Sequence, residues 1–367
     1  MNKLKEPGFD DRRINVLYII TSLKKCGPVN VLYGIVRKMD YKKFKPIIIT
    51  LKKNVENSRF KDFKELGVQI INVKLNIGSL KKIRKTVEKF NIDLIHSHGV
   101  IPDFLNMCTK FDEHGKISTM HNVPFEDYPL TFGKIIGLGL SQFHALIQRK
   151  LTCVACSKTV HDKILSKYQI ESTVIYNGVS FPTSLNQKDT RRKQNFHFLY
   201  LGNVTLGKNV GFLISSFAKM KNAKFVLDIV GDGDLYQQLK NEYQHFKNIN
   251  FYGQVYDPEK YLQESDFLVS ASLSEGMPMS VIEALSCGLP VILSDIPSHE
   301  EIMDQGNFGI IFKNNNYDDF TRSVQKIVTQ KINKQDIMNF ANKIFSDEVM
   351  SSNYQQLYRG KVRERRS

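Results

Sequence analysis

Apolar runs of strand length alternate with stretches of helical spacing along the first 180 residues. Residues 14–20 form a near-continuous apolar run, which is typical of a buried strand. A glycine-containing loop follows at residues 24–28, and after it the apolar positions have helical spacing. The same alternation predicts further strands at residues 46–51, 69–73, 93–97, 116–120 and 152–156. It therefore predicts an α/β fold in which helices cover both faces of a parallel sheet.

The alternation breaks once and then restarts. Residues 180–195 are polar and carry a basic cluster, so they are the predicted linker between two domains. Beyond them, strands are predicted at residues 197–201, 225–230, 249–252, 266–270 and 290–294. We therefore expect two doubly wound domains, residues 1–180 and 181–345. Their ligands are expected in a cleft beyond the carboxyl ends of the strands.

Positive charge is concentrated in the first half of the chain. The 367 residues include 52 lysines and arginines against 37 aspartates and glutamates, a formal net charge of +15. Residues 1–180 hold 30 of the basic and 16 of the acidic residues, so the remainder is nearly neutral. The first domain is expected to face nucleic acid, an anionic membrane or a phosphorylated acceptor. The alternative is that its lysines serve only solubility.

Composition also predicts the compartment. No stretch approaches the ~18–20 consecutive apolar residues of a transmembrane helix, and the polar residues 1–13 do not form a secretory signal. The five cysteines are odd in number and scattered, which argues against a disulfide framework. A cytoplasmic protein is therefore expected.

The densest chemical signal is the string SLSEGMPMSVIEALSCGLPV at residues 272–291. Glu275 lies in a Gly/Pro loop after a predicted strand, and Glu283 lies on the helix that this loop opens. The first N–H groups of such a helix are free to bind an anion. Glu275 can accept hydrogen bonds from substrate hydroxyls, and Glu283 can reach another hydroxylated group such as a ribose. Either glutamate alone is more simply a solvated acid, but the whole spaced string predicts a binding site.

This string resembles the donor-binding signature of glycosyltransferase family 4, which comprises retaining enzymes of the GT-B architecture. The resemblance extends over nearly the whole chain and includes residues 345–358. It implies two Rossmann-like domains facing across a cleft, with the acceptor on the first and a nucleotide sugar on the second. It also implies that residues 346–367 form a helix that packs back on the first domain. The donor-binding residues that it implies in the string are Glu275, Gly276, Met277, Pro278, Met279, Ser280 and Glu283.

Two further loops fit the resemblance, each with a departure. In residues 202–209, GNVTLGKN, Lys208 is placed to neutralise a diphosphate, whereas Asn203 replaces the arginine usual in the family. After the first strand, Gly27 allows a very close backbone approach to the donor phosphates. The family often has a second glycine and a glutamate here, and this chain has Asn30 instead of the glutamate. We expect Gly27, Asn203 and Lys208 to bind the donor and Asn30 to lie on the acceptor side.

Three histidines lie at predicted strand ends. His121 matches the family histidine that reaches the donor sugar near the reacting carbon, and His98 is expected on the acceptor side. His96 is better explained as a packed core residue. A metal site is the alternative for clustered histidines, but no carboxylate or cysteine lies at ligand spacing beside them, so no metal or other cofactor is predicted. Asp232 and Val255, at strand ends of the second domain, are expected to border the nucleotide base.

The resemblance implies transfer of a hexose or N-acetylhexosamine from a nucleotide diphosphate-sugar, with UDP favoured, to a hydroxyl of a glycan or lipid-linked acceptor. The setting that it implies is cell-surface polysaccharide assembly, and the catalytic residues are His121, Lys208 and Glu275. Charge that develops on the leaving diphosphate would be stabilised by Lys208, the backbone of Gly27 and the helix start near Ser280. Similar enzymes are thought to use front-face attack, so no pair of carboxylates flanking the bond is required.

Two segments of the first domain concern the acceptor. Residues 132–140 are apolar with a flanking lysine, and one predicted helix carries a basic cluster: Lys81, Lys82, Arg84, Lys85 and Lys89. Basic and apolar surface together is typical of a peripheral protein on an anionic leaflet. The alternative for residues 132–140 is an ordinary buried helix.

Two other functions remain open from the sequence. A sugar-nucleotide epimerase shares the two-domain fold, although the string from Glu275 to Glu283 favours a transferase. A nucleic-acid-binding protein would explain the net charge, but the chain has no zinc-finger spacing, no RNA-recognition aromatic motif and no basic region leading into heptads.

Overall fold

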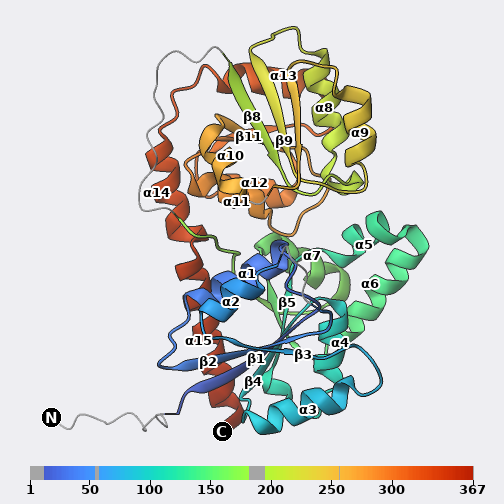
Figure 1. Ribbon diagram of the computed structural model, residues 1–367, viewed down its shortest axis with the longest axis vertical. Coiled ribbons are helices and arrows are strands. Elements are labelled where there is room, and N and C mark those ends of the chain that lie inside the picture. The colour runs from blue at the N-terminus through green and yellow to red at the C-terminus, as the bar shows by residue number, and fades with distance from the viewer. Residues whose placement is uncertain (1–11, 54–57, 182–194, 256, 367) are drawn as a thin grey trace, which may run out of the picture.

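The computed structural model describes residues 12–53, 58–181, 195–255 and 257–366. They form two α/β domains, one above the other, with α14 and α15 running along one side of both (Figure 1). Most of the predicted linker, residues 182–194, lies outside the described residues, as do residues 1–11.

The first domain contains a seven-stranded parallel sheet in the order β3-β2-β1-β4-β5-β6-β7. Its strands are β1 (Ile14–Ile20), β2 (Phe44–Thr50), β3 (Gln69–Asn72), β4 (Leu94–His98), β5 (Lys116–Met120), β6 (Thr152–Ala155) and β7 (Ser172–Val174). Its helices are α1 (Gly27–Arg37), α2 (Phe60–Glu65), α3 (Ser79–Lys89), α4 (Val100–Cys108), the 3₁₀ turn η1 (Glu113–Gly115), α5 (Pro124–Phe132), α6 (Lys134–Gln148) and α7 (Lys158–Tyr168).

The second domain contains a six-stranded parallel sheet in the order β10-β9-β8-β11-β12-β13. Its strands are β8 (Phe196–Leu201), β9 (Phe225–Val230), β10 (Ile249–Gly253), β11 (Phe267–Ser270), β12 (Val291–Ser294) and β13 (Gly309–Phe312). The remaining helices are η2 (Leu206–Lys208), α8 (Val210–Lys219), α9 (Tyr236–Tyr243), α10 (Pro258–Glu264), α11 (Met279–Ser286), α12 (Pro297–Met303), α13 (Tyr317–Ile327), α14 (Lys334–Phe345) and α15 (Asp347–Arg366).

The predicted parallel α/β architecture is confirmed, with differences at the ends of elements. Gly27 and Pro28, expected in a loop, form the first turn of α1, where proline loses no helical hydrogen bond. The pattern did not predict β7 and β13, which lie at the edges of their sheets. Edge strands bury fewer side chains, and six of the seven residues in these two strands are at least partly exposed. Their apolar signal is correspondingly weak.

Helices pack on both faces of the first sheet. On one face, α1 and α15 bury Ile35 and Tyr354 against the strands. On the other face, α3 and α4 bury Ile83 and Leu105. A further apolar core crosses from one domain to the other, because Met120 at the end of β5 belongs to the same buried cluster as residues of α11 and α14. The two domains therefore share buried surface beneath the cleft between them.

The chain crosses between the domains twice, and the two crossings are hydrogen-bonded to each other. The N–H of Val179 donates to the carbonyl of Phe345 at 2.9 Å, and the N–H of Asp347 donates to the carbonyl of Val179 at 2.9 Å. A Cβ at Gly178 would lie 2.4 Å from the carbonyl oxygen of Ser346, so only glycine permits this approach. After the second crossing, α15 packs on α1, and Arg37 of α1 forms an ion pair with Asp347.

His96 is fully buried and links the sheet to α15, which confirms its assignment as a core residue. Its Nδ1 lies 2.7 Å from the Tyr358 hydroxyl, and its Nε2 lies 2.8 Å from Oγ1 of Thr119. Tyr358 also pairs with Tyr18 at 3.0 Å. Burial lowers the pKa of His96 to about 3, so the ring is neutral near pH 7.

We expect Tyr358→Phe to lower the free energy of unfolding by about 1–3 kcal/mol. The substitution keeps the ring but removes the hydroxyl that pairs with both His96 and Tyr18, so buried polar groups lose their partner. Urea unfolding followed by circular dichroism would measure the loss. The control is Tyr317→Phe on α13, where the side chain is only half-buried. Equal effects of the two substitutions would contradict a role of the buried network in stability.

Candidate active site

A cleft of about 970 Å³ lies between the two domains at the carboxyl ends of their strands, as expected for doubly wound sheets. The first domain contributes the loop after β1, the residues after β5 and part of α5. The second domain contributes the loops after β8, β9, β10 and β11. Most residues selected from the sequence line this cleft: Gly27, Asn30, His121, Asn203, Lys208, Asp232, Val255, Glu275, Gly276, Met277, Pro278, Met279, Ser280 and Glu283.

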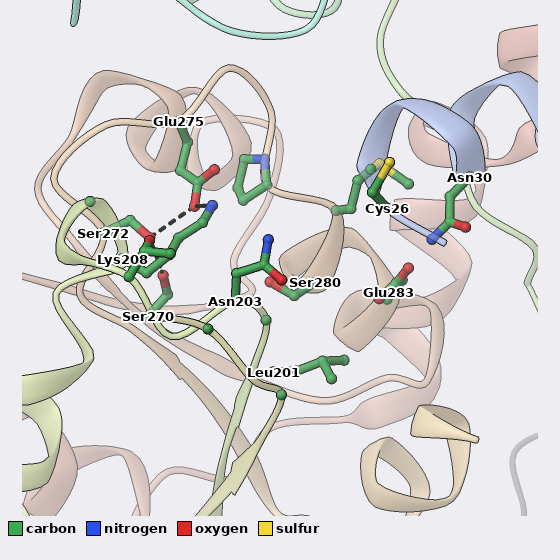
Figure 2. Close-up of a pocket in the computed structure, with 18 of the residues that line it drawn as sticks. Cys26, Asn30, Leu201, Asn203, Lys208, Ser270, Ser272, Glu275, Ser280 and Glu283 are labelled. Atoms are coloured by element: carbon green, nitrogen blue, oxygen red, sulfur yellow. Dashed lines mark hydrogen bonds and ion pairs between the residues drawn. The ribbon is translucent and has the colours of Figure 1, made fainter. Parts of the chain in front are cut away.

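Lys208 and Glu275 form an ion pair in the wall of the cleft (Figure 2). Ser272 supports the pair by donating its hydroxyl to the same carboxylate at 2.8 Å. Burial alone would raise the pKa of Glu275, but the charge and hydrogen bond of Lys208 outweigh it and lower the pKa. Asn203, which replaces the usual arginine, points into the cleft beside this pair. The cleft thus holds a cation and a carboxylate that is ionised near pH 7.

Glu283 on α11 lies at the other end of the same wall, close to Asn30 and Cys26 (Figure 2). Burial raises its pKa to about 7, although the positive charge of Arg59 from the first domain opposes the shift. The Nε of Arg59 donates to Oδ1 of Asn30 at 2.8 Å. Asn30, expected on the acceptor side, therefore lies beside the second glutamate of the string.

The start of α11 faces the cleft between the two glutamates. Met279 and Ser280, its first two residues, line the cleft, and their N–H groups have no carbonyl partner within the helix. Gly27 lies opposite, where an added Cβ would make only an ordinary contact with Met279 at 3.7 Å. The protein itself would tolerate a side chain at position 27, so a need for glycine there could come only from a bound ligand.

Gly276 is constrained by the protein itself. An added Cβ would lie 2.1 Å from the carbonyl oxygen of His121, so the loop after β11 packs directly on the backbone of the first domain. The hydroxyl of Ser157 donates to the carbonyl of Gly276 at 2.7 Å. Ser274 donates to the carboxylate of Glu126 at 2.8 Å, which also accepts from Lys163. Contacts with the first domain therefore hold the loop on both sides of Glu275.

Another contact between the two domains lies at the start of α7. The two carboxylate oxygens of Glu301, on α12 of the second domain, accept hydrogen bonds from the backbone N–H groups of Lys158 and Thr159 at 2.6 and 2.8 Å. A negative charge at a helix N-terminus is stabilising. The second domain thus supplies a capping carboxylate to a helix of the first domain.

His121 and His98 form a hydrogen-bonded pair, with 2.8 Å between Nε2 of His121 and Nδ1 of His98. His121 lines the cleft, whereas His98 is buried behind it and is not among the lining residues. Burial lowers the pKa of His121 to about 4 and that of His98 well below its usual value. Both rings are therefore neutral near pH 7, as a bond with one ring nitrogen donating and one accepting requires.

Arg59 and Asp127 are among the cleft residues that the sequence analysis did not select. Arg59 reaches the cleft from the segment before α2, where no motif marks it. Asp127 lines the cleft on α5 and accepts a hydrogen bond from Asn122 at 2.6 Å. The only signal for Asp127 was an acid in the first turn of a helix, which is common because the helix dipole favours it. Among the residues that the structure describes, no group of three or more His, Cys, Asp or Glu side chains could hold a metal ion.

Two family models match the chain on either side of the predicted linker. The model of Glycosyltransferase Family 4 matches residues 27–181, and the model of Glycosyl transferases group 1 matches residues 183–344. Together they cover all strands of both sheets except β1, and every residue that lines the cleft except Ser22, Lys24, Lys25 and Cys26.

Curated relatives carry transferase names. The O-antigen biosynthesis glycosyltransferase WclY of Escherichia coli is 26% identical, and the similarity covers 96% of this chain and 99% of that protein. The UDP-Gal:alpha-D-GlcNAc-diphosphoundecaprenol alpha-1,3-galactosyltransferase of E. coli is 27% identical, over 73% of this chain and 75% of that protein.

The fold is shared with solved glycosyltransferase structures. The Anabaena protein HepE, solved in complex with UDP and glucose, superposes with a TM-score of 0.78 over 94% of this chain and 99% of that chain, at 13% identity. Together with the two family models, this architecture identifies the molecule: the chain belongs to the glycosyltransferases of family 4 and has the GT-B fold.

Proposed function

We propose that this glycosyltransferase moves a hexose or N-acetylhexosamine from a UDP-sugar to a hydroxyl group of its acceptor, with retention of anomeric configuration. The observation that carries the proposal is the wall of the cleft on which Lys208, the start of α11 and Glu283 follow one another. A cation beside free helix N–H groups suits a diphosphate, and a carboxylate one turn further along the helix suits a ribose. The complex of HepE with UDP and glucose supports UDP as the nucleotide.

In this proposal, the residues of the cleft stabilise the diphosphate as it leaves. Negative charge grows on the leaving phosphate as the glycosidic bond breaks, and prearranged donors aimed at that charge lower the barrier. Lys208 and the N–H groups of Met279 and Ser280 supply those donors, and the backbone of Gly27 faces them across the cleft. Because Lys208 already supplies a positive charge, we propose that neither a metal ion nor another cofactor is needed.

The sugar lies, in this proposal, between Glu275 and His121. Glu275 is ionised and accepts hydrogen bonds from sugar hydroxyls, with the backbone of residues 276–279 beside it. The neutral ring of His121 approaches the same space from the first domain. Attack on the face from which the diphosphate leaves gives retention without a second carboxylate, and a phosphate oxygen accepts the proton of the acceptor hydroxyl. We therefore propose His121, Lys208 and Glu275, the three residues expected from the sequence, as the catalytic residues.

The acceptor that we propose is a glycan or a lipid-linked saccharide in bacterial cell-surface polysaccharide assembly. The printed names of the two E. coli relatives support this setting, since one concerns O-antigen biosynthesis and the other a diphosphoundecaprenol-linked acceptor. We propose the cytoplasm as the compartment, because all five cysteines lie among the described residues and are free thiols. An epimerase of the same fold would instead release an altered sugar without any acceptor, and none of the relatives named above supports it.

Donor binding gives the first prediction of this subsection. We expect one or more UDP-sugars to raise the unfolding temperature of the purified chain, and Glu275→Gln or Lys208→Met to weaken donor binding about tenfold or more, because each removes a charge-assisted hydrogen bond. Calorimetric titration would measure the affinity, with and without EDTA, which should leave it unchanged. Transfer to an acceptor, followed by NMR of the product anomer, would test retention.

Two controls separate binding from folding. Glu264→Gln removes an exposed glutamate on α10 and should leave donor affinity unchanged. Lys208→Met leaves Glu275 buried without its ion pair, so the double variant with Glu275→Gln should regain stability without regaining affinity. The transferase proposal is wrong if no UDP-sugar binds the unmodified protein, or if a bound donor is converted to a free epimer.

The histidine at the cleft gives a second prediction, on pH. The pKa of His121 is about 4 in the folded protein and about 6.5 in an unfolded chain, so the unfolded state binds more protons between these values. The free energy of unfolding should therefore fall as pH drops through this window, by up to about 1.4 kcal/mol per pH unit for this ring. His121→Asn should make the fall shallower, and the exposed His245→Asn should not. Urea unfolding at several pH values would measure both slopes, and equal slopes would contradict the buried neutral ring.

A further inference from the structure

Helix α6 exposes most of its large apolar side chains and buries small and polar ones, the opposite of an ordinary surface helix. Apart from Ile147, its buried face carries small and polar side chains: Gly137, Ser141, His144, Ala145 and Gln148. Its outer face carries large apolar side chains, with exposed fractions of 88% for Ile135, 69% for Ile136, 40% for Leu138, 46% for Phe143 and 59% for Leu146. The alternative of an ordinary buried helix at residues 132–140 is therefore wrong. Large apolar side chains that are exposed to water do not stabilise a surface helix, so this arrangement indicates a binding face.

Buried hydrogen bonds fix this orientation of α6. The two ring nitrogens of His144 lie 2.8 Å from the hydroxyl of Tyr128 and 2.8 Å from Oδ2 of Asp103. Tyr168 donates its hydroxyl to Oγ of Ser141 at 3.0 Å. A rotation that buried Ile135 and Ile136 would break all three interactions and leave polar groups in the core without hydrogen-bond partners. The apolar side chains are held outward by the fold.

Neighbouring helices extend the apolar face. Phe104 of α4 is 38% exposed, and its ring lies 6.1 Å from that of Phe143 on α6. Ile101 of α4 is exposed as well. Leu130 and Phe132 of α5, which precedes α6 in the chain, are exposed as well. We define the α4–α6 face as the exposed apolar side chains of these three helices.

Positive charge surrounds the α4–α6 face. Helix α6 contains no acidic residue, and exposed basic side chains lie at its two ends, at Lys134 and at Arg149 and Lys150. Helix α3, which covers the same face of the sheet as α4, exposes the basic cluster predicted from the sequence: Lys81, Lys82, Arg84, Lys85 and Lys89. Like charges would repel a second copy of this domain, whereas anionic lipid headgroups attract it.

We propose that the α4–α6 face docks on an anionic lipid bilayer, with the apolar side chains of α6 entering the interface and the basic residues contacting headgroups. Apolar side chains rimmed by lysine and arginine match the surface of an interfacial helix. Within the described ranges, no helix is long and apolar enough to cross a membrane, so the contact concerns the surface of the bilayer.

The docked orientation would also place the bilayer near the acceptor end of the cleft, an inference that rests on the proposed function. Leu130 lines the cleft from the α5–α6 hairpin, and a Cβ on Gly207 across the cleft would lie 3.7 Å from its Cδ1. Glu126 on the same helix is bonded to Ser274, next to Glu275. A bilayer on the α4–α6 face therefore lies beside the cleft mouth, where a lipid-linked acceptor would present its sugar.

Cosedimentation of the full chain with vesicles tests the docking surface. We expect binding to vesicles of phosphatidylcholine containing phosphatidylglycerol, and weaker binding as salt rises or when phosphatidylglycerol is left out. The double variant Ile135→Gln with Leu146→Gln should lower the partition constant about tenfold or more, because two apolar side chains no longer enter the interface. Lys82→Gln with Lys85→Gln should lower it severalfold and flatten its dependence on salt.

The control is Phe340→Gln on α14, an exposed apolar side chain in the second domain, which should leave vesicle binding unchanged. UDP-sugar affinity and unfolding temperature of each variant are measured in parallel, because Ile135 and Leu146 lie outside the cleft and should not affect them. Vesicle binding with no donor binding would overturn the proposed function alone. The docking proposal is overturned if the unmodified chain ignores anionic vesicles, if the Ile135/Leu146 variant binds them equally well, or if that variant converts a dimer to a monomer.

Discussion

The cleft depends on one backbone contact, in which the loop at Gly276 lies directly on the carbonyl of His121. There is no room for a side chain between them, so the distance between the two domains is set by main-chain atoms at this point. Ser157, Ser274 and Glu301 add hydrogen bonds around the same contact. The carboxylate of Glu275 and the ring of His121 are brought to one space because the backbone of Gly276, the next residue after Glu275, lies against that of His121.

Burial and nearby charges together decide the charge states of the two glutamates and the histidines. Glu275 remains ionised because Lys208 lies against it, whereas Glu283 has a raised pKa because Arg59 only partly offsets its burial. The histidines are neutral because no acid faces them closely enough to overcome their burial. The cleft therefore has a charged end at Lys208 and Glu275, and neutral hydrogen-bonding groups where His121 meets it. This division suits a ligand with an anionic centre and a hydroxylated sugar.

The first domain combines two kinds of surface that are normally kept apart. Its interior holds a polar network of Asp103, Tyr128 and His144 beneath α6, while apolar side chains point outward. Hydrogen bonds between buried polar groups favour one packing arrangement and resist rotation. The same network thus maintains an exposed apolar face, and exposed basic residues lie at both ends of α6 and on α3.

The sequence predicted the parallel sheets, the family and several loops that line the cleft, because these depend on local periodicity and on spacing within single loops. The string from Glu275 to Glu283 is contiguous, so its residues had to lie at one strand end and helix start. Arg59 could not be found this way, since its position beside Glu283 depends on how two domains meet. The position of Asn30 beside Glu283 and the burial of His98 behind the cleft likewise depended on residues distant in the chain. For α6, an apolar pattern without its partners fits a buried helix and an exposed one equally well. Only the tertiary structure decided which face pointed outward, because the buried hydrogen bonds of His144 and Ser141 come from α4, α5 and α7.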